Sequence, residues 1–137
     1  MLKYTELKSK HQAEVDAFPL GFAYNDAQFA EMMAKWGLNP EDTNEICFIG
    51  FGGYVRKSDA DAMQEMFVRH NDEMRAAMQD FDFAYEAFNY ELANHEYCVT
   101  YDATDAIAAL GLSMKEINAS FMLKSALKKA IAAQEDF

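Results

Sequence analysis

The segment ICFIGFGGYVRK, from Ile46 to Lys57, constrains the fold most, because its composition disfavours a helix throughout its length. It is rich in β-branched and aromatic residues, which favour strands, and it is interrupted by Gly50, Gly52 and Gly53. Glycines accept the positive φ angles that a tight hairpin turn requires. The segment therefore predicts a two-stranded hairpin that turns near Gly52-Gly53.

A further strand is predicted in FPLGFAY, where Phe18, Leu20, Phe22 and Tyr24 occupy alternate positions. A period of two residues is typical of a half-buried strand. The expected sheet has three antiparallel strands, formed by the segments near Leu20–Tyr24, Glu45–Ile49 and Gly53–Arg56.

Most of the remaining chain has helical spacing. A first helix is expected from Thr5 to about Asp16, and NDAQ at Asn25 to Gln28 is a capping box that opens a second helix. A short helix is expected from Asp102 or Thr104 to Leu110, and one or two C-terminal helices are expected from Ser113 to about Gln134. The sequence thus predicts an α+β fold, predominantly helical, in a single domain covering residues 1–137.

Two long helical segments lie in the middle of the chain. Ser58 is expected to cap a helix that runs to about Gln79, and the short linker Asp80 to Asp82 leads into another helix, Phe83 to Tyr97. A short connection between helices favours antiparallel neighbours, so we expect a central antiparallel helix pair. The inward positions of the first helix are predicted to be Met63, Phe67, His70, Met74 and Ala77.

The second of these helices is aromatic on two faces, which is typical of a helix sandwiched inside a fold. One stripe consists of Phe81, Tyr85, Phe88 and Leu92, and the other consists of Phe83, Tyr90 and Tyr97. If the second stripe is not buried within one chain, it is available for a structural homo-oligomer, which is one of the alternatives for function.

Length and composition limit the class of protein. The chain has 137 residues, of which 51% are hydrophobic and 14% aromatic, enough for a sizeable core. It contains no run of eighteen apolar residues, and its first residues are polar and charged, so we expect a cytoplasmic protein. Cys47 and Cys98 lie far apart and have no C-x-x-C spacing, which favours two reduced thiols over a disulfide.

The formal net charge of −11 argues against direct binding of nucleic acid or of an anionic membrane. Between Asp59 and Asp105, twelve acidic residues face only two arginines, so most of the net charge lies in this third. Asp61, Glu65 and Asp72 share a helix face almost without basic partners, and such concentrated charge repels itself. A basic protein surface is the complementary partner. The candidate partner-binding residues are Asp61, Glu65, Asp72, Glu73, Asp80, Asp82 and Glu86.

The stretch ELANHEYC suggests a second kind of site. Glu91 and His95 are one helical turn apart, and His70 on the preceding helix is expected at a similar height if the two helices are antiparallel. Two imidazoles and a carboxylate suit zinc or iron, so a metal-binding protein or metal-dependent enzyme is an alternative. Against it, the His-Glu-x-x-His pattern is absent, and buried histidines usually complete hydrogen bonds in a core.

Other patterns predict no chemistry. The glycines of GFGG are better explained by a hairpin turn than by a phosphate-binding loop, because no Walker or Gly-x-Gly-x-x-Gly pattern is present. His95 and Cys98 lie three residues apart, but no third group is evident to orient the histidine. We therefore expect a protein that is not an enzyme and that needs no cofactor.

Four segments resemble a family of short uncharacterised proteins carried by phages and other mobile elements of bacteria. They are YTELKSKHQAEVDAFPLGFAY, GFGGYVRKSDADAMQEMFVRH, YELANHEYC and ALGLSMKEINA. The resemblance covers nearly the whole chain, and its most specific parts are Gly52-Gly53 with Arg56, Lys57 and Ser58, and the residues from Tyr90 to Tyr97. It implies a bacterial mobile element as the setting, but no activity. Relatives carry a longer, glycine-containing link where this chain has only QDFDF.

The leading hypothesis is a non-enzymatic acidic interaction protein of a mobile element. It binds a basic host or element protein, as a nucleic-acid mimic or a counter-defence inhibitor. Small acidic proteins of such elements often occupy nucleic-acid-binding surfaces, and this association agrees in sign with the charge.

Overall fold

The computed structural model describes residues 3–135, and their contacts group into two compact units. The first unit comprises residues up to His11 together with those from Arg69 onwards, and the second comprises Gln12–Val68. Each unit has its own cluster of buried apolar side chains. The single domain over residues 1–137 remains a prediction from chain length and composition.

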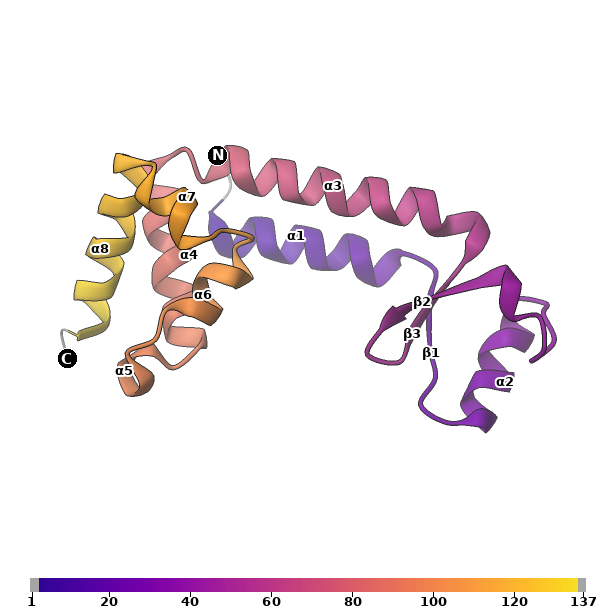
Figure 1. Ribbon diagram of the computed structural model, residues 1–137. Coiled ribbons are helices and arrows are strands. Elements are labelled where there is room, and N and C mark those ends of the chain that lie inside the picture. Colours follow the sequence, from indigo (N-terminus) through magenta and orange to yellow (C-terminus); the bar gives the residue numbers. More distant parts are fainter. Residues whose placement is uncertain (1–2, 136–137) are drawn as a thin grey trace. The chain divides into compact units, whose positions relative to one another are not determined.

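The α+β prediction is confirmed: the chain is predominantly helical with one small three-stranded antiparallel sheet (Figure 1). The elements, in chain order, are α1 (Tyr4–Ala17), β1 (Leu20–Phe22), α2 (Asp26–Lys35), β2 (Ile46–Gly50), β3 (Gly53–Arg56), α3 (Ala60–Ala77), α4 (Phe81–Asn94), α5 (Tyr97–Thr100), α6 (Thr104–Ala109), α7 (Met114–Asn118) and α8 (Phe121–Glu135). Two 3-10 turns, Thr43–Glu45 and Lys57–Asp59, precede β2 and α3. No helix within residues 3–135 combines the length and the apolar character needed to cross a membrane.

The sheet of the second unit has the strand order β1-β3-β2. The hairpin between β2 and β3 turns at Phe51 and Gly52, both with positive φ, one position earlier than the predicted Gly52-Gly53, because Gly53 already begins β3. The ring of Tyr24 lies so close to Gly52 that a Cβ there would be 2.4 Å from Tyr24 Cε1. This contact requires glycine at position 52.

Helix α2 packs on the sheet and is bounded by local hydrogen bonds. The Asn25 side chain accepts from the Gln28 N–H at 2.8 Å, and the Gln28 side chain accepts from the Tyr24 N–H at 2.8 Å. Gly37, at a φ of 72°, ends the helix, and the next N–H, that of Leu38, donates to the Met33 carbonyl. These signals are the ones the sequence predicts for a capped helix with a glycine stop.

The core of the first unit is built around α4, which buries six of its fourteen residues, whereas Tyr90 of the second predicted stripe is exposed. Phe88 and Leu92 are fully buried, and burial of each such side chain contributes about 1.5–3 kcal/mol. Asp80 caps the helix by accepting from the Phe83 N–H at 2.9 Å.

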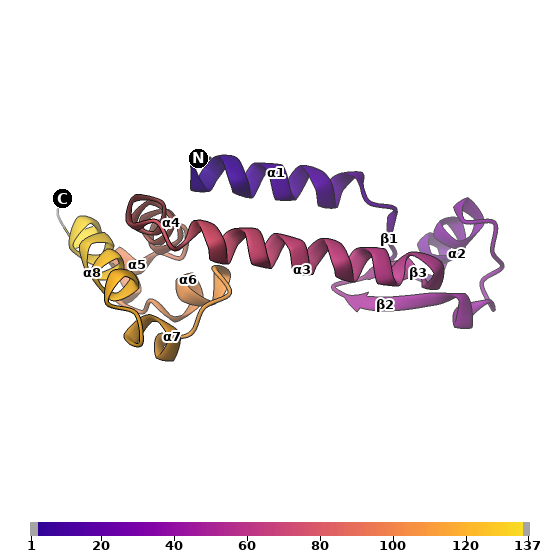
Figure 2. The ribbon, with the colours of Figure 1, turned by 90° about the horizontal axis from the view of Figure 1, so that it is seen from above.

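The predicted antiparallel pairing of the two long helices is wrong, because α4 packs along α8 and against α6 and has few contacts with α3. The two views of Figures 1 and 2 both show α8 beside α4. Gln134 of α8 contacts Asn89 of α4, and Lys129 contacts Tyr85, which lies earlier in α4. Since later residues of α8 contact later residues of α4, the two helices run parallel. The link after α3 is short and contains the buried Met78, and the chain changes direction there instead of folding back along α3.

The buried face of α3 differs at one position from the prediction. Phe67 is 44% exposed, whereas Met66 and His70 are buried. The predicted Met74 and Ala77 are half-buried as expected, so the face itself is not rotated. Residues 66 and 67 are about 100° apart around the helix axis, since a turn has about 3.6 residues, and both border the same face. Residue spacing alone does not distinguish these neighbouring choices.

Packing of α2 against β1 gives a test of the second unit. A Cβ at Gly21 would be 2.5 Å from Met32 Sδ and 2.8 Å from Trp36 Cη2. We expect Gly21→Ala to lower the free energy of unfolding by about 1–3 kcal/mol, the usual cost of overpacking. Denaturant unfolding followed by the fluorescence of Trp36, the single tryptophan, measures this.

Met32→Ala removes the side chain that the new methyl group would meet, so it provides the control. In the Met32→Ala background, Gly21→Ala should cost less than in the native chain. An equal cost in both backgrounds would contradict the packing described here.

Candidate functional site: exposed carboxylates, a buried carboxylate and an aromatic hairpin

The predicted partner-binding carboxylates are divided between the two units. Asp61 and Glu65 lie one turn apart on the part of α3 in the second unit, and both are exposed. The remaining predicted residues, Asp72, Glu73, Asp80, Asp82 and Glu86, belong to the first unit. Within residues 3–135, neither Asp61 nor Glu65 forms an ion pair.

The five carboxylates of the first unit are not equivalent. Asp72 and Asp82 are exposed without an ion pair in the described chain, and Glu86 is half-buried. Asp80 is exposed but is used as the cap of α4. Glu73 is held by His11 at 2.7 Å and Arg69 at 3.2 Å, and these hydrogen bonds lower its pKa. Of these residues, Glu73 and Asp80 therefore have structural roles.

Glu91 lies in the core of the first unit, where only 1% of its surface is exposed. Its Oε1 accepts a hydrogen bond from the Tyr4 hydroxyl and another from Lys8 Nζ at 2.7 Å. Lys8 Nζ also lies 4.9 Å from the centre of the Tyr90 ring. The start of α1 is thus fixed to α4 by a charged and hydrogen-bonded cluster.

Burial by itself would raise the pKa of Glu91, but the hydrogen bonds from Lys8 and Tyr4 outweigh it and hold the pKa below its ordinary value. Burial and the adjacent carboxylate raise the pKa of Tyr4, so its hydroxyl stays protonated and can donate. The second oxygen, Glu91 Oε2, has no hydrogen-bond partner within the described residues, and His95 Nε2 is 3.4 Å away.

The three predicted metal ligands do not come together. Glu91 and His95 are neighbours, but the His70 ring stacks on His11 at 3.9 Å between centroids. No group of three His, Cys, Asp or Glu residues that could hold a metal ion occurs in the part of the chain that the structure describes. The prediction placed His70 near Glu91 because it assumed that α4 folds back along α3.

The two cysteines and the second aromatic stripe add no site. Cys47 is partly buried and Cys98 exposed, both as free thiols. Phe83 and Tyr97 are buried in the core of the first unit, so the stripe expected for a homo-oligomer leaves only Tyr90 partly exposed.

The sequence reasoning missed a group of exposed aromatic residues in the second unit. Phe22, Tyr24, Phe48 and Phe51 are 56%, 73%, 64% and 97% exposed. Phe22 and Tyr24 were expected on a half-buried face, but a three-residue strand at the sheet edge leaves them uncovered. Phe51, placed between two glycines at the predicted turn, was the signal that could have revealed an exposed aromatic tip.

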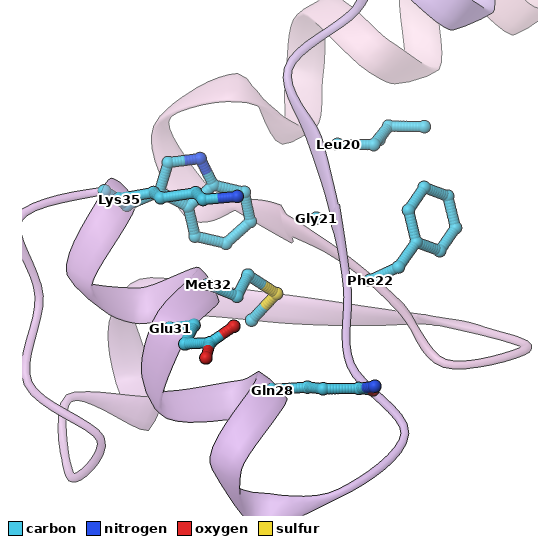
Figure 3. A pocket seen from close by; sticks show the side chains of 8 residues that line it. Leu20, Gly21, Phe22, Gln28, Glu31, Met32 and Lys35 are labelled. Carbon is cyan, nitrogen blue, oxygen red and sulfur yellow. The ribbon is translucent and has the colours of Figure 1, made fainter.

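Two grooves lie on the sides of the second unit. The first groove has a volume of about 350 Å³ and is lined by residues of α2 and β1. Figure 3 shows Gln28, Met32 and Lys35 of α2 directed toward the strand, with Leu20 and Phe22 pointing away from α2. Because Glu31 and Lys35 carry opposite charges, this groove does not favour a ligand of one sign. The second groove, about 300 Å³, lies between the start of α2 and the hairpin.

The comparisons with known proteins identify the family only. Residues 3–133 match a family of unknown function, DUF7659. The chain belongs to this family. Neither the curated proteins nor the solved structures include a match.

The Glu91 cluster predicts a pH dependence of stability. The lowered pKa means that Glu91 contributes stability above its ordinary pKa of 4.5, and this contribution is lost as the pH falls through the lowered value. We expect Glu91→Gln to cost about 1–3 kcal/mol at neutral pH, because Lys8 and Tyr4 lose a charged acceptor, and less at acidic pH.

Glu86→Gln, five residues earlier on α4 and without an ion pair in the described chain, is the matched control and should change stability little. Thermal unfolding from neutral to acidic pH distinguishes the two variants. A Glu91→Gln penalty that stays constant across this range would contradict the role given to the ionised carboxylate.

Proposed function

We propose that this chain is a non-enzymatic protein of a bacterial mobile element that binds a basic host or element protein. The observation that carries the proposal is the charge of the second unit. Residues 12–68 contain ten carboxylates and three basic side chains, a net charge of −7. Asp61 and Glu65 belong to this set and are exposed without ion pairs in the described chain.

Unpaired carboxylates on a folded surface repel one another and reduce stability. Association with a basic surface relieves that repulsion and speeds encounter, and salt screens both effects. Protein surfaces that bind nucleic acid are basic, because they must offset phosphate charge. A chain of this kind is therefore suited to occupy such a surface as a nucleic-acid mimic, which would make it a counter-defence inhibitor if the target is a nuclease.

The cellular setting rests on the resemblance of four segments to proteins of phages and other mobile elements. A cytoplasmic location is part of the same proposal, since basic nucleic-acid-binding proteins of the host are found there.

Asp72, Asp82 and Glu86 of the first unit are included as secondary contacts. Glu73 and Asp80 are included as weaker candidates, since His11, Arg69 and the start of α4 already use them.

The test begins with capture of a partner from bacterial host lysate at low salt, followed by purification of that partner. Binding rates are then measured by surface plasmon resonance at about 50 mM and about 300 mM salt. We expect the pair Asp61→Asn and Glu65→Gln to slow association at low salt by roughly threefold to tenfold and to reduce its salt dependence.

The pair Asp72→Asn and Asp82→Asn removes the same charge from the first unit and serves as the matched comparison. It should have a smaller effect, because that unit carries less net charge. Nucleic acid that binds the partner should compete with the chain. Unchanged rates and unchanged salt dependence in both double variants would refute the proposal.

A further inference from the structure

The groove between the start of α2 and the hairpin combines aromatic rings with a carboxylate. Tyr24, Phe29, Phe48 and Tyr54 contribute rings, and Asp26 contributes the charge. Among the residues that line this groove, none is basic, and Asp26 forms no ion pair within residues 3–135. The groove thus offers a negative charge and π faces together.

The rings are held at an angle to one another. Phe29 and Tyr54 meet edge to face with centroids 5.4 Å apart, and Phe48 and Tyr54 are tilted with centroids 5.2 Å apart. Phe29 and Tyr54 are half-buried against the core of the unit, whereas Tyr24 and Phe48 are mostly exposed. Two rings therefore have fixed positions, and two present their surface to an incoming group.

Gly52 sets the shape of this groove. Its missing side chain lets the Tyr24 ring lie directly on the hairpin, since a Cβ would meet three atoms of that ring within 3 Å. The position of the Tyr24 ring in the groove thus depends on glycine at the turn. Tyr24 and Phe48 are nevertheless 73% and 64% exposed.

We infer that this groove binds an arginine side chain of the basic partner. An aromatic face attracts a cation through its quadrupole, and a planar guanidinium can stack on a ring while its N–H groups reach a carboxylate. The N-terminal end of α2 carries about half a positive charge from the helix dipole, which repels a cation. The full negative charge of Asp26 is larger than this and attracts the cation. The inference rests on the proposed function and names the partner group that the second unit recognises.

The experiment uses small probes, so it does not depend on the partner. N-acetyl-arginine amide is titrated into the full chain and followed by NMR shifts of groove residues, with N-acetyl-citrulline amide as the neutral probe of nearly equal shape. We expect the arginine probe to bind at the groove at least threefold more tightly than the citrulline probe.

Variants then separate the two contributions. Asp26→Asn should weaken the arginine probe by roughly threefold to tenfold, and Phe48→Leu by about twofold to fivefold, the range for exposed cation–π contacts. Phe51→Leu alters an aromatic residue of the same hairpin that does not line the groove, and it should leave binding unchanged. Unaltered NMR spectra outside the groove show that each variant is folded.

Equal binding of the two probes, or equal loss in Phe48→Leu and Phe51→Leu, would overturn the inference. That result would not affect the proposed function, which is judged by the Asp61 and Glu65 variants with the partner. Conversely, arginine-specific binding at the groove supports the inference even if those charge variants leave partner binding intact.

Discussion

The contact between Glu91 and the first turns of α1 determines how the first unit is assembled. Both Tyr4 and Lys8 donate to the same carboxylate oxygen of Glu91. This oxygen therefore connects α4 with residues that precede Glu91 in the chain by 87 and 83 positions. A carboxylate with 1% exposure is costly to bury unless its charge is compensated, so the two donors and the helix must be placed together. The nearby rings of Phe83 and Tyr90 pack edge to face against the Tyr4 ring, at centroid distances of 5.9 Å and 5.6 Å.

The arrangement of α4 follows from this and from its apolar surface. A helix with a wide buried face needs several partners, and α1, α6 and α8 supply them. Parallel packing of α8 on α4 requires a connection that returns the chain to the same end, and the short helices α5, α6 and α7 form it. The two histidines of the candidate metal site are consequently used for other contacts, His70 against His11 and His95 beside Glu91.

The second unit follows a different principle. Its sheet has three short strands and one covering helix, so it cannot bury all the aromatic residues that favour strand formation. Two of those left outside, Tyr24 and Phe48, line a groove together with Asp26, which forms no ion pair within the described residues. Apolar surface and negative charge together favour a partner that offers both a cation and a planar or apolar group, and an arginine-rich surface has both properties.

The sequence by itself determined the local structure. Gly50 and Gly52 fixed the hairpin turn, the Asn25 and Asp80 side chains fixed helix starts, and Gly37 fixed a helix end. Each of these depends on hydrogen bonds and φ angles within a few residues. The tertiary structure alone decided that α8, not α3, is the neighbour of α4. It also decided that Phe67 is exposed in place of Met66, and that Phe22, Tyr24 and Phe48 remain uncovered. Periodicity shows which residues share a face of an element, but which element covers that face depends on contacts between residues far apart in the chain.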